Sequence, residues 1–244
     1  MAIGMSRTVI KGYLKSVPLL ADLPDEDIDL VVNQARDVSY RRGARVFEEG
    51  AAADCCYVLT SGRMRVALST ANGSEILLHV ITPTTLVGEV ALLDGAARSA
   101  SLVAIDACHL IRIPAQAFEG LRRNATFEKR VVASVVATLR DSEERVRVIA
   151  TFPSVNRVAW CLARIARHSG RRDGRAIVVP GTPHQELAEM AGCTRETVTR
   201  SLATLRRRKY VSWDASGIRL ETDGLQRYLT TELIAAGERP GPVT

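Results

Sequence analysis

The chain of 244 residues is long enough for one large or two modest domains. Hydrophobic residues make up 46% and charged residues 25%, which is ordinary for a globular protein. No apolar run reaches the roughly 18 residues that a membrane-spanning helix needs, and residues 1–15 lack the apolar core of a signal peptide. We therefore expect a cytoplasmic protein with no membrane partner.

The net charge of +6 is concentrated in the second half of the chain. Residues 1–150 contain 18 Lys or Arg and 18 Asp or Glu, whereas residues 151–244 contain 15 and 9. Such an asymmetry indicates that one half of the protein binds a polyanion. A merely basic surface explains the charge equally well, so a motif has to decide between the two interpretations.

The five cysteines are odd in number and scattered, which argues against a disulfide framework. The sequence has neither a Cys-x-x-Cys pair nor four-ligand spacing, so we predict no metal site. Cys55 and Cys56 are adjacent, and on a strand their side chains would point to opposite faces. We expect reduced structural thiols, with a redox role for this pair as the alternative.

The first elements in chain order are helices, followed by strands. Residues 8–35 look helical, with a Leu-Pro-Asp-Glu-Asp start signal at 23–27. Residues 38–113 consist of short alternating segments separated by glycines and asparagines. Asn72-Gly73 lies between two alternating runs, which is a strong hairpin signal. Many short strands with regular turns predict an antiparallel roll or barrel.

A long helix is predicted from Ala115 to about Ala150, because no Gly or Pro follows Gly120 there. Apolar residues recur along it at spacings of three and four, which is the heptad pattern of a coiled coil. We therefore expect a homodimer, and packing of the helix on its own barrel is the alternative. The predicted dimerisation residues are Val132, Val135, Leu139, Val146 and Ile149.

Ser142 is the one polar residue in this seam, and Glu143 follows it within reach of a partner helix. A polar residue in a seam costs stability unless it sets the register or contacts something. A hydrogen bond from Ser142 to a ligand beside the seam is one interpretation, and a register role is the other. Pro153 disfavours helical geometry at Phe152, so the helix ends at a candidate hinge, residues 152–154.

Two helices joined by a tight turn are predicted after the hinge. A helix through Trp160, a loop at 171–174 and a short strand at 176–179 precede them. The first of the two helices opens with Thr182 as the cap, Pro183 at the first helical position and Gln185 in a capping box. Ala191-Gly192-Cys193 has the length of the turn in a helix-turn-helix.

The second helix carries side chains that suit DNA reading. Arginine pairs with guanine O6 and N7, and glutamate accepts from cytosine N4. At the start of a recognition helix such side chains point into the major groove, and a basic run at its far end touches phosphates. A solvated, salt-bridged helix is the alternative, and a small hairpin at 211–220 is the predicted wing. The predicted DNA contacts are Thr194, Arg195, Glu196, Thr197, Arg200, Arg206, Arg207 and Arg208.

Residues 88–100 contain the groups needed to hold a cyclic phosphodiester and a ribose. Small residues around Asp94-Gly95 let the backbone approach a ligand. Arg98 can pair with a phosphate, and Ser99 adds a hydroxyl and an amide. Glu89 can accept from a ribose hydroxyl, as acids do in nucleotide sites. A buried Glu89–Arg98 salt bridge is the purely structural alternative.

Gly88-Glu89 with Arg98-Ser99-Ala100 closely resembles the phosphate-binding cassette of cyclic-nucleotide-binding domains. Residues 192–200 resemble the recognition element of the catabolite activator (CRP/FNR) family, and most closely its cAMP receptor branch. The resemblance implies an α+β fold: a β-roll (double-stranded β-helix or jelly roll), a long dimerisation helix and a winged helix-turn-helix. The implied ranges are 1–114 for the β-roll with its N-terminal helices, 115–151 for the dimerisation helix, 152–154 for the hinge, 155–230 for the DNA-binding domain and 231–244 for a tail.

The resemblance also implies a regulator rather than an enzyme, with cAMP as ligand, double-stranded DNA as partner and RNA polymerase as a further candidate partner. A TGTGA-like pseudo-palindrome is the implied operator. Ribose and cyclic phosphate would contact Gly88, Glu89, Arg98, Ser99 and Ala100, and Ser142 and Glu143 would lie near the base, partly across the dimer.

Three departures from the family pattern matter. Thr82-Pro83-Thr84-Thr85 replaces the usual Gly-acid turn, and Glu143 replaces a small hydroxyl residue that bears on adenine selectivity. His184 replaces an arginine that helps contact DNA, so we expect it at the DNA with a different half-site preference at its edge. A redox or nitric-oxide gate through the cysteines, or ligand-independent DNA binding, remains the alternative on the same fold.

Overall fold

The computed structural model divides into two compact units, Met1–Asp141 and Ser142–Thr244, each with a hydrophobic core. The predicted Asn72-Gly73 turn and the tail at 231–244 lie outside the described residues. Within the part of the chain that is described, no helix is both long and apolar enough to cross a bilayer. The described residues are 5–70, 75–174, 176–179, 181–214 and 217–221.

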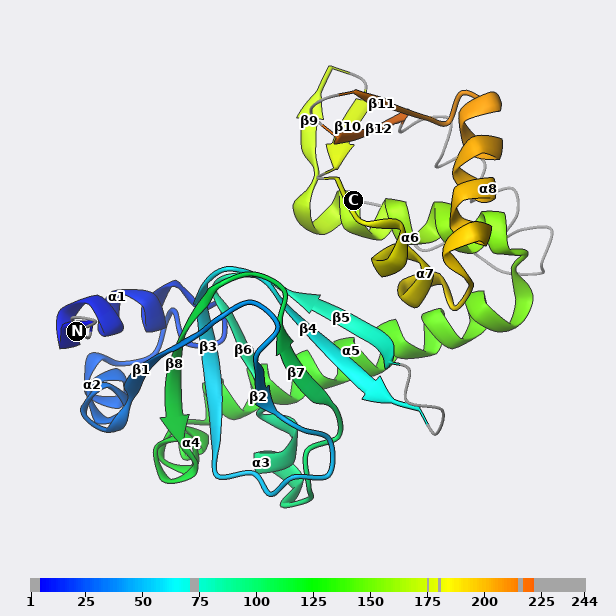
Figure 1. Cartoon of the computed structure of the whole chain (residues 1–244). Coiled ribbons are helices and arrows are strands. Elements are labelled where there is room, and N and C mark those ends of the chain that lie inside the picture. The colour runs from blue at the N-terminus through cyan, green and yellow to red at the C-terminus, as the bar shows by residue number, and fades with distance from the viewer. Residues whose placement is uncertain (1–4, 71–74, 175, 180, 215–216, 222–244) are drawn as a thin grey trace. The chain divides into compact units, whose positions relative to one another are not determined.

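Two antiparallel four-stranded sheets form the centre of the described first unit. Their strand orders are β1-β8-β3-β6 and β2-β7-β4-β5, so most neighbours within a sheet come from distant parts of the sequence (Figure 1). This is the predicted antiparallel roll, and the pairing of β4 with β5 confirms the predicted hairpin. The strands are β1 Arg36–Tyr40, β2 Arg45–Phe47, β3 Cys55–Ser61, β4 Met64–Ser69, β5 Glu75–Ile81, β6 Thr85–Val87, β7 Ser101–Ala104 and β8 Cys108–Pro114.

Strand β3 is buried on both faces because the first unit has three layers. These are the β2-β7-β4-β5 sheet, the β1-β8-β3-β6 sheet and the helices that cover its outer face. Cys55 and Leu59 belong to the core between the two sheets. Cys56 and Val58 belong to a second core, where helices such as the one carrying Phe118 cover the outer face of the sheet. Since successive side chains of a strand alternate between faces, the predicted opposite orientation of Cys55 and Cys56 is confirmed.

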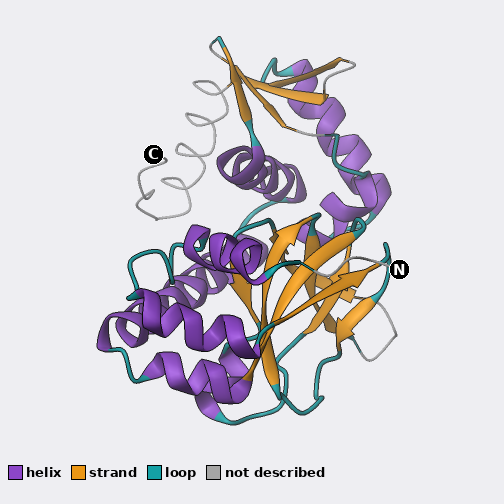
Figure 2. Cartoon of the chain, turned by 90° about the vertical axis from the view of Figure 1, so that its left-hand side faces the viewer, coloured by secondary structure: helices purple, strands orange, loops and turns teal. Residues whose placement is uncertain are grey.

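The helices of the first unit gather on the outer side of the β1-β8-β3-β6 sheet (Figure 2). The predicted start signal at 23–27 is confirmed, because the second helix begins at Asp25 with three acidic residues in its first turn, where they complement the helix dipole. A further short helix, α3, follows β6. The helices are α1 Arg7–Ser16, α2 Asp25–Gln34, α3 Val90–Asp94, α4 Ala115–Arg122 and α5 Ala125–Thr151.

The predicted single helix from 115 to 150 is wrong, because the chain breaks between α4 and α5. The side-chain oxygen of Asn124 accepts from the backbone N–H groups of Thr126 at 3.0 Å and Phe127 at 3.3 Å, which caps α5. Its amide nitrogen donates to Asp27 at 2.8 Å. The break lets Phe118 and Phe127 meet edge to face, with ring centroids 5.8 Å apart.

The second unit combines three helices with a four-stranded antiparallel sheet of order β11-β12-β10-β9 in the described residues. The last turns of α5 contribute Val148 to its core. The elements are α6 Ser154–Ser169, β9 Arg171–Asp173, β10 Ala176–Val179, α7 His184–Ala191, α8 Arg195–Arg207, β11 Val211–Asp214 and β12 Gly217–Glu221.

Most predicted elements of this unit are confirmed, including the end of the long helix before Pro153 and the β11–β12 wing. Two details differ. Residues 171–173 are not loop but strand β9, which pairs with β10. Helix α7 begins at His184 with Pro183 in the N-cap position, one residue later than predicted. The side-chain amide of Gln185 donates to Glu189 at 3.2 Å, so it is not directed at the cap.

Candidate functional site

Arg98 and Gly88 are fitted to each other at the centre of the predicted ligand cassette. The Arg98 side chain is buried, and its Nη1 donates to the carbonyl oxygen of Gly88 at 2.7 Å. Gly88 has a φ of +84°, a left-handed conformation that favours glycine. A Cβ at this position would lie 2.8 Å from Arg98 Nη1 and 3.3 Å from the Phe47 ring. Only glycine therefore lets the guanidinium approach the backbone here.

Two further contacts fix the Arg98 guanidinium. Nη2 donates to the carbonyl oxygen of Cys55 at 2.6 Å, and the guanidinium carbon lies 4.2 Å from the centroid of the Phe47 ring. Its backbone is tied to the loop after β2, since its N–H donates to Ala51 O and its carbonyl accepts from Gly50 N, both at 2.8 Å. The cation is thus rigidly placed.

Arg98 makes no ion pair with a carboxylate among the described residues, so the alternative of a Glu89–Arg98 salt bridge is wrong, although the two side chains interact electrostatically over a longer distance. Buried cations are costly unless they are paired. In addition, Arg98 Nε is buried and has no hydrogen-bond partner among the described residues. A rigid, buried, unpaired guanidinium with an unused donor fits an anionic phosphate.

Glu89 stands at the N-cap position of α3, and its carbonyl oxygen accepts from Leu92 N at 2.9 Å and Leu93 N at 3.0 Å. Burial raises the pKa of the Glu89 carboxyl, and this outweighs the opposing effect of Arg98. The carboxyl is held away from bulk water, and in such surroundings a hydrogen bond from a ligand hydroxyl is stronger than it is in water. The five-residue helix that positions it was not predicted.

The remaining cassette residues border this centre. Ala100 is buried, whereas Ser99 is exposed and has its hydroxyl available to a ligand. Thr84, in the turn that departs from the family pattern, has a φ of 67°. Its backbone N–H donates to Leu59 O at 2.8 Å and its hydroxyl to Pro83 O at 2.6 Å. Thr84 thus takes a left-handed conformation in this turn, which glycine adopts more readily.

Ser142 and Glu143 belong to the second unit, so their part in the ligand site stays a prediction. Ser142 is half-buried and Glu143 is exposed. The apolar seam on the same helix is largely exposed, with fractions of 50% at Val132, 57% at Leu139 and 67% at Val146. Val131 and Val148, on other faces of α5, are buried. The seam residues therefore do not belong to the hydrophobic cores of the chain.

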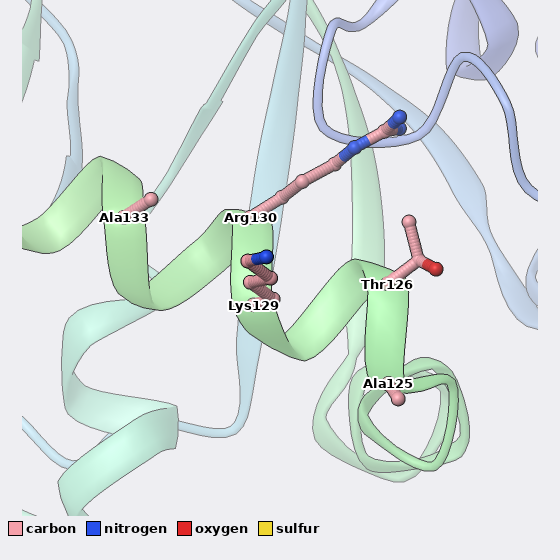
Figure 3. Close-up of a pocket in the computed structure, with 5 residues that line it drawn as sticks. All are labelled: Ala125, Thr126, Lys129, Arg130 and Ala133. Carbon is pink, nitrogen blue, oxygen red and sulfur yellow. The ribbon is translucent and has the colours of Figure 1, made fainter.

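A hollow of about 550 Å³ lies along the first turns of α5 (Figure 3). Arg130, which borders it, makes an ion pair with Asp22 at 2.6 Å. The hollow shares no residue with the cassette, so the ligand assignment rests on the cassette's chemistry. The lining residues are Ala125, Thr126, Lys129, Arg130 and Ala133.

The predicted helix cap is confirmed at Thr194, whose hydroxyl oxygen accepts from Thr197 N at 3.2 Å at the start of α8. Gly192 supplies the turn with a φ of 59°. Buried Val198, Ser201, Leu202 and Leu205 form the inner face of α8. Exposed residues of the outer face and far end include Arg195, Glu196, Thr199, Arg200, Arg206, Arg207 and Arg208.

Two arginines that sequence reasoning missed hold the helix-turn-helix in place. Arg145 on α5 donates to the carbonyl oxygens of Glu189 at 3.3 Å and Met190 at 3.1 Å. Arg157 on α6 donates to Gly192 O at 3.3 Å. Cations suit the carbonyl end of a helix, and no sequence spacing links these residues to it.

The cysteines lack the features of reactive thiols. Burial raises the pKa of each thiol, to about 12 at Cys161. Because the thiolate is the reactive form, these surroundings disfavour a redox or nitric-oxide gate. Among the described residues, no group of three or more His, Cys, Asp or Glu is arranged to hold a metal ion.

Family comparisons match both halves of the chain. Residues 37–125 match the cyclic nucleotide-binding domain, and residues 156–228 match the Crp-like helix-turn-helix domain. The cyclic AMP receptor protein of Thermus thermophilus is 30% identical over 193 residues, which cover 79% of this chain and 87% of that protein.

Solved structures share the fold. A CooA mutant from Carboxydothermus hydrogenoformans has a TM-score of 0.73 at 16% identity, covering 87% of this chain and 95% of that one. The c-di-GMP responsive regulator CLP of Xanthomonas campestris has a TM-score of 0.66 at 19% identity, covering 81% and 99%. Proteins similar to this chain in sequence or in fold are therefore described with different nucleotides, cyclic AMP and c-di-GMP.

Proposed function

This chain belongs to the CRP/FNR family of cyclic-nucleotide-binding, DNA-binding transcription regulators, and we propose that cAMP is its effector. The observation that carries the proposal is the buried Arg98 guanidinium, which has no carboxylate partner and a free Nε. A cyclic phosphodiester carries one negative charge and would neutralise it. Glu89 would accept from the ribose hydroxyl, and exposed Ser99 would donate to a phosphate oxygen.

The chain acts as a homodimer in this proposal. The exposed seam of α5 would pair with the same seam of a second copy, which removes large apolar side chains from water. Two recognition helices related by a two-fold axis would then bind a pseudo-palindromic, TGTGA-like operator with half-sites one helical turn apart. Binding of cAMP in the β-roll would reorient the helix-turn-helix domains. Arg145 and Arg157 would transmit this change by holding the turn.

A calorimetric titration of the purified protein with cAMP, cGMP and c-di-GMP tests the effector. We expect cAMP to bind at one site per protomer and more tightly than the other two. Tight binding of c-di-GMP alone, or no binding of any cyclic nucleotide, would overturn the proposal. The titration with cGMP is informative because Glu143 replaces the small hydroxyl residue that bears on adenine selectivity.

A further inference from the structure

His184, the first residue of α7, is hydrogen-bonded to the recognition helix. Its Nδ1 lies 3.0 Å from the hydroxyl oxygen of Thr199 on α8. The same hydroxyl donates to the carbonyl oxygen of Arg195, one turn earlier in α8, at 3.1 Å. His184 Nε2 has no hydrogen-bond partner among the residues that the structure describes.

This arrangement favours one of the two neutral tautomers of the His184 imidazole. A threonine hydroxyl has a single hydrogen, and the carbonyl oxygen of Arg195, 3.1 Å from Thr199 Oγ1, can only accept it. If it turned toward His184 instead, the lone pairs of Thr199 Oγ1 and Arg195 O would face each other at 3.1 Å. The geometry therefore favours the arrangement in which the hydroxyl oxygen accepts and His184 Nδ1 carries the hydrogen. In the neutral ring, Nε2 is then an acceptor without a proton.

Thr199 also determines where this acceptor is presented. It follows Arg195 by four residues and Glu196 by three, so all three share one exposed face of α8. The buried residues of the helix, Val198 and Leu202 among them, lie on the opposite side. The hydrogen bond thus attaches an α7 side chain to the face that carries the base-reading residues.

We propose that His184 reads a base bearing an exocyclic amino group, through an Nε2 acceptor whose tautomer and position Thr199 sets. Such donors in the major groove are adenine N6 and cytosine N4. A phosphate offers only acceptors, so the neutral ring does not contact the DNA backbone through this atom. This proposal rests on the function proposed above, because it requires α8 to lie in the major groove. Thr199 is a positioning residue that need not touch DNA.

The tautomer is tested without DNA, by ¹⁵N-detected NMR of the histidine rings at about pH 8, where imidazole is ordinarily neutral. We expect the Nδ1–H tautomer at His184 in the native chain and in Thr199→Ser, which keeps the hydroxyl. Thr199→Val removes the acceptor and should shift His184 toward the Nε2–H form. A native His184 in the Nε2–H form would overturn the proposal.

Base reading is tested by selection from random duplexes with cAMP present. The native chain should enrich adenine or cytosine at one position flanking each half-site core. In Thr199→Val this preference should fall by about threefold to tenfold, the worth of one hydrogen bond, while the core stays unchanged. Thr204→Val is the matched control, because Thr204 makes the same 3.1 Å bond to the carbonyl four residues earlier but meets no histidine.

The selection distinguishes failure of base reading by His184 from failure of the proposed function. A pseudo-palindrome with no amino-base preference at its flank, or an unchanged preference in Thr199→Val, would overturn the assignment of His184 and leave the proposed function standing. If no duplex is enriched by the native chain, both the proposed function and base reading by His184 fail. The NMR result then still decides the tautomer.

Discussion

The close fit between Gly88 and Arg98 is the strongest constraint on the proposed ligand site. Arg98 is buried and held by the carbonyl oxygens of Gly88 and Cys55 rather than by a carboxylate. Truncation therefore removes the only buried cation of the cassette. Charge-assisted hydrogen bonds contribute about 1.5–3 kcal/mol each.

Arg98→Ala should weaken cAMP binding by more than tenfold and leave the chain folded, as measured by calorimetry and thermal unfolding. Arg63→Ala is the control, because Arg63 makes a 2.7 Å ion pair with Asp106 in the same unit, at a half-exposed surface position. Unchanged cAMP affinity in Arg98→Ala would remove the site assignment.

Gly88→Ala tests the same site without deleting a charge. The new Cβ would lie 2.8 Å from Arg98 Nη1, so the guanidinium has to move and cAMP binding should weaken. The left-handed φ of +84° should also lower the free energy of unfolding by about 1 kcal/mol. Gly43→Ala is the matched control, since Gly43 has a φ of +80° but open space around its Cβ position. Equal cAMP affinities of the two variants would contradict the close-approach argument.

Sequence motifs identified the cassette because its residue types are dictated by chemistry. They did not reveal that Arg98 is anchored by Cys55 O, because a backbone carbonyl has no sequence signature. The Thr199–His184 bond was missed for a similar reason, since it joins two exposed side chains on different helices. The individual contacts of a site depend on tertiary placement, which a residue pattern does not encode.

At the scale of elements, helix α5 contributes side chains to the helix-covered core of the first unit and to the core of the second unit. Its apolar seam remains exposed. Leu139→Glu places two like charges opposite each other in a paired seam and should yield monomers with poor operator binding, measured by sedimentation. Ala137→Glu adds the same charge at an exposed position off the seam and should leave the dimer intact. A dimeric Leu139→Glu variant would contradict the coiled coil.

We propose that helix α8 divides its arginines between base contacts near its start and phosphate contacts at its far end. Arg195→Ala should cost about 1–3 kcal/mol in operator binding and relax the preference at one G·C pair. Arg207→Ala should weaken binding to all sequences alike and flatten the dependence on salt, because it removes a phosphate contact. Binding measured over a salt series on matched and altered duplexes separates the two. Equal losses of specificity would mean that the wrong helix has been placed in the groove.

Element boundaries were predicted where glycine, proline or caps punctuate the chain, as at Pro153 and Thr194. The break between α4 and α5 was missed because an asparagine makes it with its side chain, which is visible only in three dimensions. Strand β9 was taken for loop because Arg171 and Arg172 are polar and exposed, and only pairing with β10 makes them a strand.

For the whole molecule, we propose that a nucleotide bound in one unit controls DNA binding by the other. The uneven charge supports the division of tasks, since residues 151–244 hold 15 basic and 9 acidic residues. Electrostatic attraction alone would give affinity that depends on salt but is indifferent to cAMP. Gating requires that cAMP bind the DNA-competent conformation better than the other conformations.

The most direct test is operator affinity with and without saturating cAMP at one fixed salt concentration, on a duplex selected by the protein itself. We predict that cAMP raises the affinity by at least about fivefold, the lower end of typical allosteric coupling. The increase should be lost in Arg98→Ala, while its basal binding stays the same. An affinity that is equal with and without cAMP in the native chain would contradict the account.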